Sequence, residues 1–336
     1  MDIYITLDYE LFLGDKTGSP ENCLINPMGS LLDLAANEGI RYTIFVDATY
    51  LLRLYEFKDE VPLLKNHYEM VVNNIRECVN KGHDIQLHIH PQWLYSKWDT
   101  KENKWIMDKD HYKLSDLSLY EAKELLIKAK QKLDGIVGYK TTAFRAGGFC
   151  LDNFSEYKDL FYELGLNIDS SVARDQYVES KIHYYDYRNI PTKQIYYFTD
   201  SIKKENCKGT FIELSISSFS CSKLYYFFRV KKLRKNYNPS VVYKDGESIS
   251  DGGSVFGGKI KKLLNNYSTI CSIDAAASCY LNEYYKGIVK NGLGELILIG
   301  HPKHASNESI KNLRQFLHDH KSDRYLTVTD LLGSCC

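Results

Sequence analysis

The sequence predicts an α/β protein built on a mostly parallel sheet, and it favours a barrel over an open, doubly wound sheet. Apolar, strand-like segments alternate repeatedly with amphipathic, helix-like segments along the 336 residues, a pattern typical of consecutive βα units. Polar and ionisable residues directly follow several of the predicted strands. Because the functional groups of barrels gather at the carboxyl ends of the strands, this distribution indicates a barrel with its site at that end.

Length and composition exclude several classes of protein. A chain of 336 residues that is 44% apolar and 26% charged can form one large globular domain. Lys and Arg together number 43, as do Asp and Glu, so no global charge attracts a nucleic acid and none is expected as a partner. We expect a single domain over residues 1–336, with an inserted basic and Gly-rich region at about 219–265.

The N-terminal residues show no leader-peptide pattern, and no apolar run approaches the ~18–20 residues that cross a bilayer. The nine cysteines are odd in number and include no Cys-x-x-Cys pair, which argues against a disulfide framework and against a thiolate zinc site. We therefore expect a cytoplasmic protein without a transmembrane segment.

The first strand is predicted over residues 3–7 and is followed by Asp8, Tyr9 and Glu10. Because side chains alternate along a strand, Asp8 and Glu10 share one face. These two carboxylates either cap a following turn or form a chemical site at the end of the strand.

A helix and a buried strand follow. Asn26 as N-cap and Pro27 at the first helical position predict a helix that ends at Gly39. Residues 41–46 read as a buried strand, and Asp47 follows it. A third carboxylate is therefore expected at the same edge of the sheet, within reach of a substrate.

Two histidines mark the next predicted strand. A helix over about residues 66–80 leads through Gly82 to a segment that carries His88 and His90 on one face. The roots of these side chains lie about 7 Å apart on a strand. This spacing lets two ring nitrogens bind one ion at roughly 2.0–2.1 Å, as zinc prefers. The alternative is two half-buried polar residues at a strand end.

A long loop and a helix come next. Residues 95–115 read as a loop that lines the site. Ser118 and Glu121 form a capping box for a helix that ends at Gly135. The residues expected on its apolar face are Leu119, Ala122, Leu125, Leu126, Ala129 and Leu133.

Two further strands end in charged residues. The strand at 141–144 leads to Arg145, and a helix over about 153–164 precedes a short strand near 167–168 that leads to Asp169. Arg145 is either a site residue or a structural partner of any acid. Asp169 is either a site residue or the start of an Asx turn without chemical function.

The second half of the chain contains more irregular segments. The elements expected there are a Tyr-rich stretch at 177–197, a strand at 211–216, a basic aromatic segment at 223–235, a Gly-rich loop at 245–258, a helix over about 274–289, a strand at 296–299 before His301, a last helix and a strand at 325–328.

Five motifs in this order resemble those of the polysaccharide deacetylases, the NodB-homology proteins of carbohydrate esterase family four. They are Thr6–Glu10 (TLDYE), Gly82–Pro91 (GHDIQLHIHP), Phe144–Gly148 (FRAGG), Asp169–Ser171 (DSS) and Leu298–Pro302 (LIGHP). The resemblance covers nearly the whole chain. It implies a distorted (β/α) barrel of about seven strands and a metal-dependent hydrolase that removes acetyl groups from N-acetylated sugars.

The resemblance also implies roles for individual residues. Asp8 matches the general base, and Arg145 matches the arginine that orients it. His301 matches the general acid, and Asp169 matches the acid that holds this histidine. The implied metal ligands are Glu10, His88 and His90.

Two positions depart from the common pattern of the family. The second metal histidine usually lies four residues after the first, where this chain has Gln92. His90 is therefore expected as the third ligand, with Gln92 left open. Tyr9 stands where the commoner branch has the metal aspartate.

The resulting hypothesis is a metal-dependent N-deacetylase, with zinc the expected ion. The expected substrate is an acetamido sugar carried on a nucleotide or lipid diphosphate during surface polysaccharide biosynthesis. One alternative is hydrolysis of another amide, such as a cyclic ureide or imide, and another is an inactive barrel that binds glycans. The segment 223–235 is either a solvated helix face or a peripheral contact with an anionic membrane or a pyrophosphate.

Overall fold

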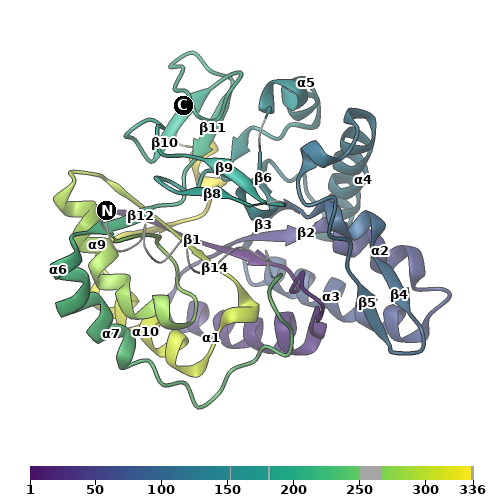
Figure 1. Cartoon of the computed structure of the whole chain (residues 1–336), viewed down its shortest axis with the longest axis horizontal. Coiled ribbons are helices and arrows are strands. Elements are labelled where there is room, and N and C mark those ends of the chain that lie inside the picture. Colours follow the sequence, from purple (N-terminus) through teal and green to yellow (C-terminus); the bar gives the residue numbers. More distant parts are fainter. Residues whose placement is uncertain (152, 181, 250–266, 334–336) are drawn as a thin grey trace.

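The structure, a computed structural model, describes residues 1–151, 153–180, 182–249 and 267–333. Its centre is a sheet in which seven described strands run parallel (Figure 1). In spatial order they are β14 (Glu295–Gly300), β1 (Asp2–Tyr9), β2 (Thr43–Asp47), β3 (Asp84–Ile89), β6 (Ala143–Ala146), β7 (Ile168–Asp169) and β11 (Phe211–Leu214).

Backbone hydrogen bonds bridge the gap between the two ends of this sheet. The N–H of Ser217, which follows β11, donates to the carbonyl of Ile297 on β14 at 3.1 Å, and the N–H of Ile273 donates to Ile299 at 2.9 Å. The N–H of Ile299 in turn donates to Cys271 at 3.1 Å. The sheet is therefore a nearly closed barrel, and the predicted fold class is confirmed.

Two strands lie outside this ring. The strand β10 (Ile195–Phe198) pairs antiparallel with β11, and β15 (Arg324–Leu326) pairs parallel with the first half of β1.

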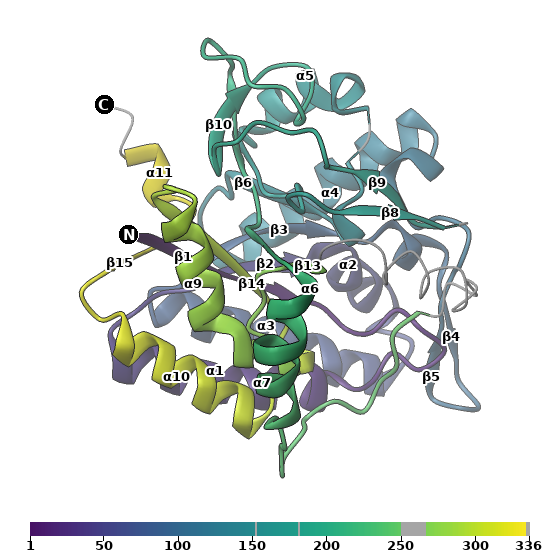
Figure 2. The same ribbon diagram turned by 60° about the vertical axis from the view of Figure 1, so that its left-hand side comes forward.

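Helices cover the outside of the barrel (Figures 1 and 2). They include α1 (Asn26–Glu38), α2 (Ala48–Phe57), α3 (Pro62–Asn80), α4 (Leu119–Val137), α5 (Phe154–Leu164), α9 (Leu281–Lys290), α10 (Asn307–Asp319) and α11 (Asp330–Gly333). None of the helices in the described part of the chain is long and apolar enough to cross a membrane.

Some predicted helix boundaries are wrong. Asn26 has helical dihedral angles because a π-helical turn (Glu21–Ile25) leads directly into α1, so it is not an N-cap. The capping box of Ser118 and Glu121 begins α4 as predicted, but the helix passes Gly135 and ends before Gly138, whose φ is 82°. A left-handed residue of this kind is what terminates a helix, whereas a single glycine inside one is tolerated.

Several predicted loops contain short regular elements. The segment 95–115 holds the hairpin of β4 (Lys97–Asp99) and β5 (Lys104–Ile106), and the Tyr-rich stretch holds that of β8 (Tyr177–Glu179) and β9 (Tyr184–Asp186). The strands β12 (Ser218–Cys221) and β13 (Tyr267–Ile270) pair antiparallel and bring the two ends of the predicted insertion together. Residues 250–258 of the predicted Gly-rich loop lie outside the described residues.

The core has two parts. The larger lies between the sheet and the helices, where α4 buries the predicted apolar face except for Leu119, which is 42% exposed. The smaller is a cluster in which Tyr4, Phe45, Ile168 and Ile297 come from four different barrel strands. It supports the polar residues that follow at the carboxyl ends of these strands.

Candidate active site and metal centre

The alternation of β1 separates the site from the core. Tyr9 turns toward the helix layer, where its hydroxyl donates to Asn74 Oδ1 on α3 at 3.0 Å. Asp8 and Glu10 take the opposite face and lie at the carboxyl end of the barrel, both buried. A tyrosine at position 9 is therefore a core residue in this chain.

Glu10, His88 and His90 form a compact cluster. One ligand atom from each residue lies within 4.8 Å of the other two, and no other such group of His, Cys, Asp and Glu occurs among the described residues. His88 Nε2 lies 2.9 Å from Glu10 Oε2, and His90 Nε2 contacts the same oxygen. Two imidazoles and one carboxylate that converge in this way match the donor set that zinc prefers.

Each histidine is held by its surroundings. His88 Nδ1 lies 2.7 Å from the carbonyl oxygen of Arg145, which turns its Nε2 toward Glu10. His90 packs against Gly147, where a Cβ atom would lie 2.5 Å from His90 Nδ1 and 2.6 Å from the carbonyl oxygen of Ile89. A glycine is therefore required at position 147 for the close approach of β6 to the end of β3.

The position left open by the departure from the family pattern is occupied by a buried amide. Gln92 is fully buried, and neither Nε2 nor Oε1 of its side chain has a hydrogen-bond partner in the described structure. The histidine that joins Glu10 and His88 is His90.

Asp8 is held by a fully buried arginine. Arg145 donates from Nη1 to Asp8 Oδ1 at 2.5 Å and from Nη2 to Thr6 Oγ1 at 2.9 Å. It also donates to both the carbonyl and the hydroxyl of Ser170, at 2.9 and 2.8 Å. Its guanidinium lies 4.1 Å above the ring of Phe45. The carboxylate of Asp8 thus has a fixed direction.

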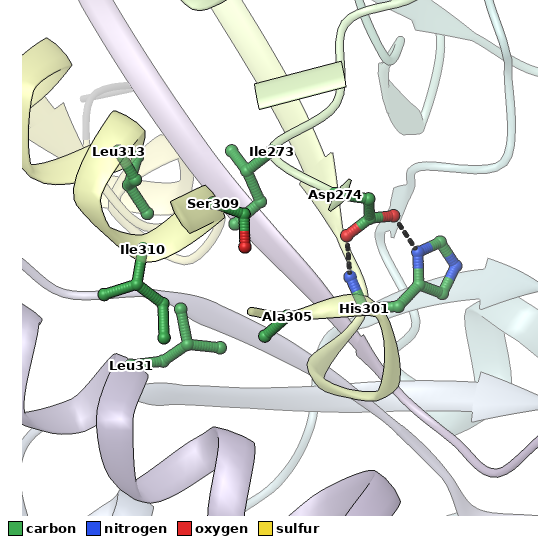
Figure 3. Close-up of a pocket in the computed structure, with 8 residues that line it drawn as sticks. All are labelled: Leu31, Ile273, Asp274, His301, Ala305, Ser309, Ile310 and Leu313. Atoms are coloured by element: carbon green, nitrogen blue, oxygen red, sulfur yellow. Dashed lines mark hydrogen bonds and ion pairs between the residues drawn. The ribbon is translucent and has the colours of Figure 1, made fainter. Parts of the chain in front are cut away.

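His301 completes the rim of the site and is bound by Asp274 (Figure 3). The two oxygens of Asp274 accept from the backbone N–H of His301 and pair with its Nδ1, both at 2.7 Å. The other ring nitrogen, Nε2, lies 3.8 Å from Asp8 Oδ2 and 3.7 Å from Glu10 Oε1. His301 therefore faces both carboxylates of β1.

Apolar side chains lie behind the pair of Asp274 and His301, as Figure 3 shows. The pocket next to the pair is lined by residues that include Leu31, Ile273 and Leu313. They keep water away from the far side of the pair and strengthen its electrostatic attraction.

The prediction that Asp169 holds His301 is wrong. Asp169 Oδ2 accepts from the backbone N–H of Ser171 at 3.0 Å, and Oδ1 accepts from its hydroxyl at 2.7 Å. This is the local Asx turn that the sequence left open. Asp169 also hydrogen-bonds to Glu213, and burial followed by the charge of Asp169 raises the pKa of Glu213 well above its usual range.

Lys303, like Asp274, belongs to the site although the sequence did not predict it. Its Nζ donates to Glu10 Oε1 at 2.8 Å and to the carbonyl of Leu11 at 2.9 Å. The two oxygens of Glu10 are thus divided between one lysine and two histidines. The position of Lys303, two residues after His301 in the Gly-His-Pro-Lys-His segment, was the only signal in the sequence.

The charges of the site shift several pKa values. Burial alone lowers the pKa of His88, but the charge of Asp8 and its contact with Glu10 raise it to about 9. Burial opposes ionisation of Glu10, yet Lys303 and the two histidines hold its pKa well below the usual range. Burial likewise lowers the pKa of His301, and Asp274, Asp8 and Glu10 raise it overall.

The assignment of Asp274 can be tested by titration. In metal-free protein, Asp274→Asn should lower the pKa of His301 because a neutral amide stabilises the imidazolium less than a carboxylate does. Asp169→Asn, the matched control, should leave that pKa nearly unchanged. The measurement is an NMR titration of the His301 ring protons, and a larger fall in the Asp169 variant would contradict the assignment.

Comparisons with known proteins agree with this architecture. No protein-family model and no curated protein sequence matches the chain. Among solved structures, it is similar to a Mycobacterium smegmatis protein described as a polysaccharide deacetylase, with 14% identity and a TM-score of 0.51 over 99% of this chain and 88% of the other.

Two further similarities are weaker. PuuE allantoinase has 12% identity and a TM-score of 0.49, over 99% of this chain and 89% of the other. The Bc1960 peptidoglycan N-acetylglucosamine deacetylase has 11% identity and a TM-score of 0.42, over 98% and 86%.

Identities this low establish a shared fold and no shared activity. The predicted resemblance is thus confirmed at the level of the architecture: the chain has the barrel fold of the polysaccharide deacetylases of carbohydrate esterase family four.

Proposed function

We propose that this protein is a metal-dependent hydrolase that removes the N-acetyl group from an acetamido sugar. The observation that carries the proposal is the position of Asp8 and His301 beside the three-residue cluster of Glu10, His88 and His90 at the carboxyl end of the barrel. A base, an acid and a set of metal-binding atoms therefore share one site. The fold shared with a protein described as a polysaccharide deacetylase supports a carbohydrate substrate.

The cluster fits a divalent ion. Glu10, His88 and His90 would hold it, and two imidazoles with one carboxylate favour zinc. When bound, such an ion would supply Lewis-acid polarisation of the amide carbonyl and acidify a bound water. The hydrogen bond between His88 Nδ1 and the Arg145 carbonyl keeps the ring in the orientation that binding requires.

Asp8 is the proposed general base. Its Oδ1 is occupied by Arg145, so Oδ2 is the oxygen left to accept a proton from the attacking water, and it lies on the side of His301. The hydrogen bond from the guanidinium prevents the carboxylate from turning away.

His301 is the proposed general acid. Asp274 accepts a hydrogen bond from Nδ1–H and so keeps one proton on Nδ1. The second proton of the imidazolium, which can be transferred, is then on Nε2, and Nε2 faces Asp8 and Glu10. Burial lowers the pKa of His301, but the surrounding carboxylates raise it overall, which favours the protonated ring. A protonated Nε2 can then pass its proton to the leaving amine of the sugar.

The finer parts of the proposal concern substrate and location. We place the substrate among acetamido sugars linked to a nucleotide or lipid diphosphate in surface polysaccharide biosynthesis, and the enzyme in the cytoplasm. The chemistry at the amide is the same for either carrier.

The test is acetate release from a panel of nucleotide- and lipid-diphosphate N-acetylhexosamines by the zinc-loaded protein. Asp8→Asn should lower the rate by about 10³-fold because it removes the base. The matched control is Asp59→Asn, which changes an exposed acid in the turn between α2 and α3 and should leave the rate unchanged.

Three outcomes would contradict the proposal. The first is acetate release by the Asp8 variant at the rate of the wild type. The second is ring opening of cyclic ureides or imides without acetate release from any sugar, which would identify a hydrolase of another amide. The third is glycan binding without turnover, which would identify an inactive barrel.

Lys303 provides a separate test of the metal centre. Lys303 and the proposed ion both draw on the charge of Glu10, so each should weaken the interaction of the other with this carboxylate. Lys303→Met should lower the free energy of unfolding of metal-free protein by about 3 kcal/mol, as expected for a broken buried ion pair. Zinc should then stabilise the variant more than it stabilises the wild type.

The measurement is chemical denaturation with and without zinc. A matched control is Lys130→Met, which breaks the buried pair of Lys130 with Asp134 at 2.8 Å in α4. This variant should have a lower free energy of unfolding, but zinc should raise that free energy only as much as it does in the wild type. If zinc raised the free energy of unfolding equally in the Lys303 variant and the wild type, Lys303 and the ion would not compete for Glu10.

A further inference from the structure

The segment 223–235, here called the basic segment, has an unusual charge for this chain. It contains six Lys and Arg residues and no Asp or Glu, whereas the whole chain has 43 of each kind. The basic segment therefore carries a local excess of positive charge, although the chain as a whole has equal numbers of basic and acidic residues.

The basic segment is one continuous helical rod in the structure. It consists of α6 (Lys223–Tyr225), a π-helical turn (Tyr226–Val230) and α7 (Lys231–Lys235). Figures 1 and 2 show it on the outside of the molecule, beside α9. It is thus an addition to the outer layer of the barrel.

One side of the rod is attached to the protein. Val230 is fully buried, and the ring of Tyr226 stacks on that of Tyr267 with 4.3 Å between centroids. Arg229 binds the buried carboxylate of Glu283, with 3.0 Å from Nη2 to Oε1. These contacts fix which side of the rod faces outward.

The outward side combines large apolar side chains with cations. Leu224 is 72% exposed, Phe227 53% and Phe228 78%. These three positions follow the spacing i, i+3, i+4, so they lie on one face of the helix. Such a concentration of exposed apolar side chains marks an interaction surface.

Four cations beside this face have no acidic partner among the described residues. Lys231, Lys232, Arg234 and Lys235 form no ion pair within the described part of the chain, and all four are exposed. Lys231 also makes a cation–π contact with Phe227, at 5.0 Å. The cations are therefore available to an anionic partner.

We infer that the basic segment docks the protein on an anionic membrane surface. Leu224, Phe227 and Phe228 enter the headgroup region, while the unpaired cations of α7 bind the anionic headgroups. A lipid surface is the partner that matches an exposed apolar face and unpaired positive charge on one short helix. This inference does not depend on the proposed hydrolase activity.

The experiment is co-sedimentation of the full chain with two kinds of vesicle. One is phosphatidylcholine with about 30% phosphatidylglycerol, which gives a clear negative surface charge, and the other is phosphatidylcholine alone. The protein should bind the anionic vesicles at low salt, bind the neutral vesicles at least tenfold more weakly, and dissociate in high salt.

Two pairs of substitutions separate the apolar and charged contributions. Leu224→Ser with Phe228→Ser, and Lys231→Gln with Lys232→Gln, should each weaken binding to anionic vesicles by about tenfold or more. The matched control combines Tyr120→Ser and Lys140→Gln, two residues exposed elsewhere on the surface, and should bind like the wild type. Because all of these side chains are exposed, the variants should fold normally, which circular dichroism checks.

Several results would overturn the inference. The first is failure of the wild type to sediment with anionic vesicles at low salt. The second is binding of both segment variants to these vesicles as tightly as the wild type. The third is binding of the same segment to duplex DNA or RNA in place of vesicles. Self-association that the Leu224 and Phe228 substitutions abolish, without vesicle binding, would also overturn it and would identify a second copy of the chain as the partner.

Discussion

Arg145, a buried residue of β6, joins four strands at the carboxyl end of the barrel through its guanidinium and its carbonyl. It donates to Asp8 and Thr6 on β1 and to Ser170 after β7, while the carbonyl of the same residue positions His88 on β3. A buried cation is costly unless its donors are paired, and loss of one partner costs about 3–5 kcal/mol. The arrangement of these strand ends is therefore constrained by one residue, whose guanidinium holds the proposed base Asp8 and whose carbonyl holds the proposed ligand His88.

This constraint divides the interior of the barrel into two layers. Below Arg145 lie apolar side chains such as Phe45, whose ring carries the guanidinium, and Tyr4 and Ile297. Above it lie Glu10 and the histidines, whose charges are balanced among themselves and by Lys303. Hydrogen bonds thus orient Asp8, Glu10 and His88 without any ion or substrate, and such orientation is what positioning of a nucleophile requires.

The sequence was most informative where contacts follow from local periodicity. Alternation along β1 and β3 places Asp8 with Glu10 and His88 with His90, and parallel pairing through β2 brings the two strand ends to one edge. Asp274 and Lys303 were missed because their contacts arise only when the chain closes the barrel through β14. Asp169 was assigned to His301 by its motif, although its own turn satisfies it locally. Closure depends on register between distant strands, which no local pattern contains.

The central claim is that Glu10, His88 and His90 bind one divalent ion. X-ray absorption of the wild-type protein with one equivalent of zinc tests it most directly, because the nine cysteines offer the ion a competing set of ligands. We predict that the ion has only nitrogen and oxygen atoms as ligands, with two imidazoles at about 2.0–2.1 Å. Sulfur neighbours at about 2.3 Å, or a spectrum of hydrated zinc without imidazole, would contradict it.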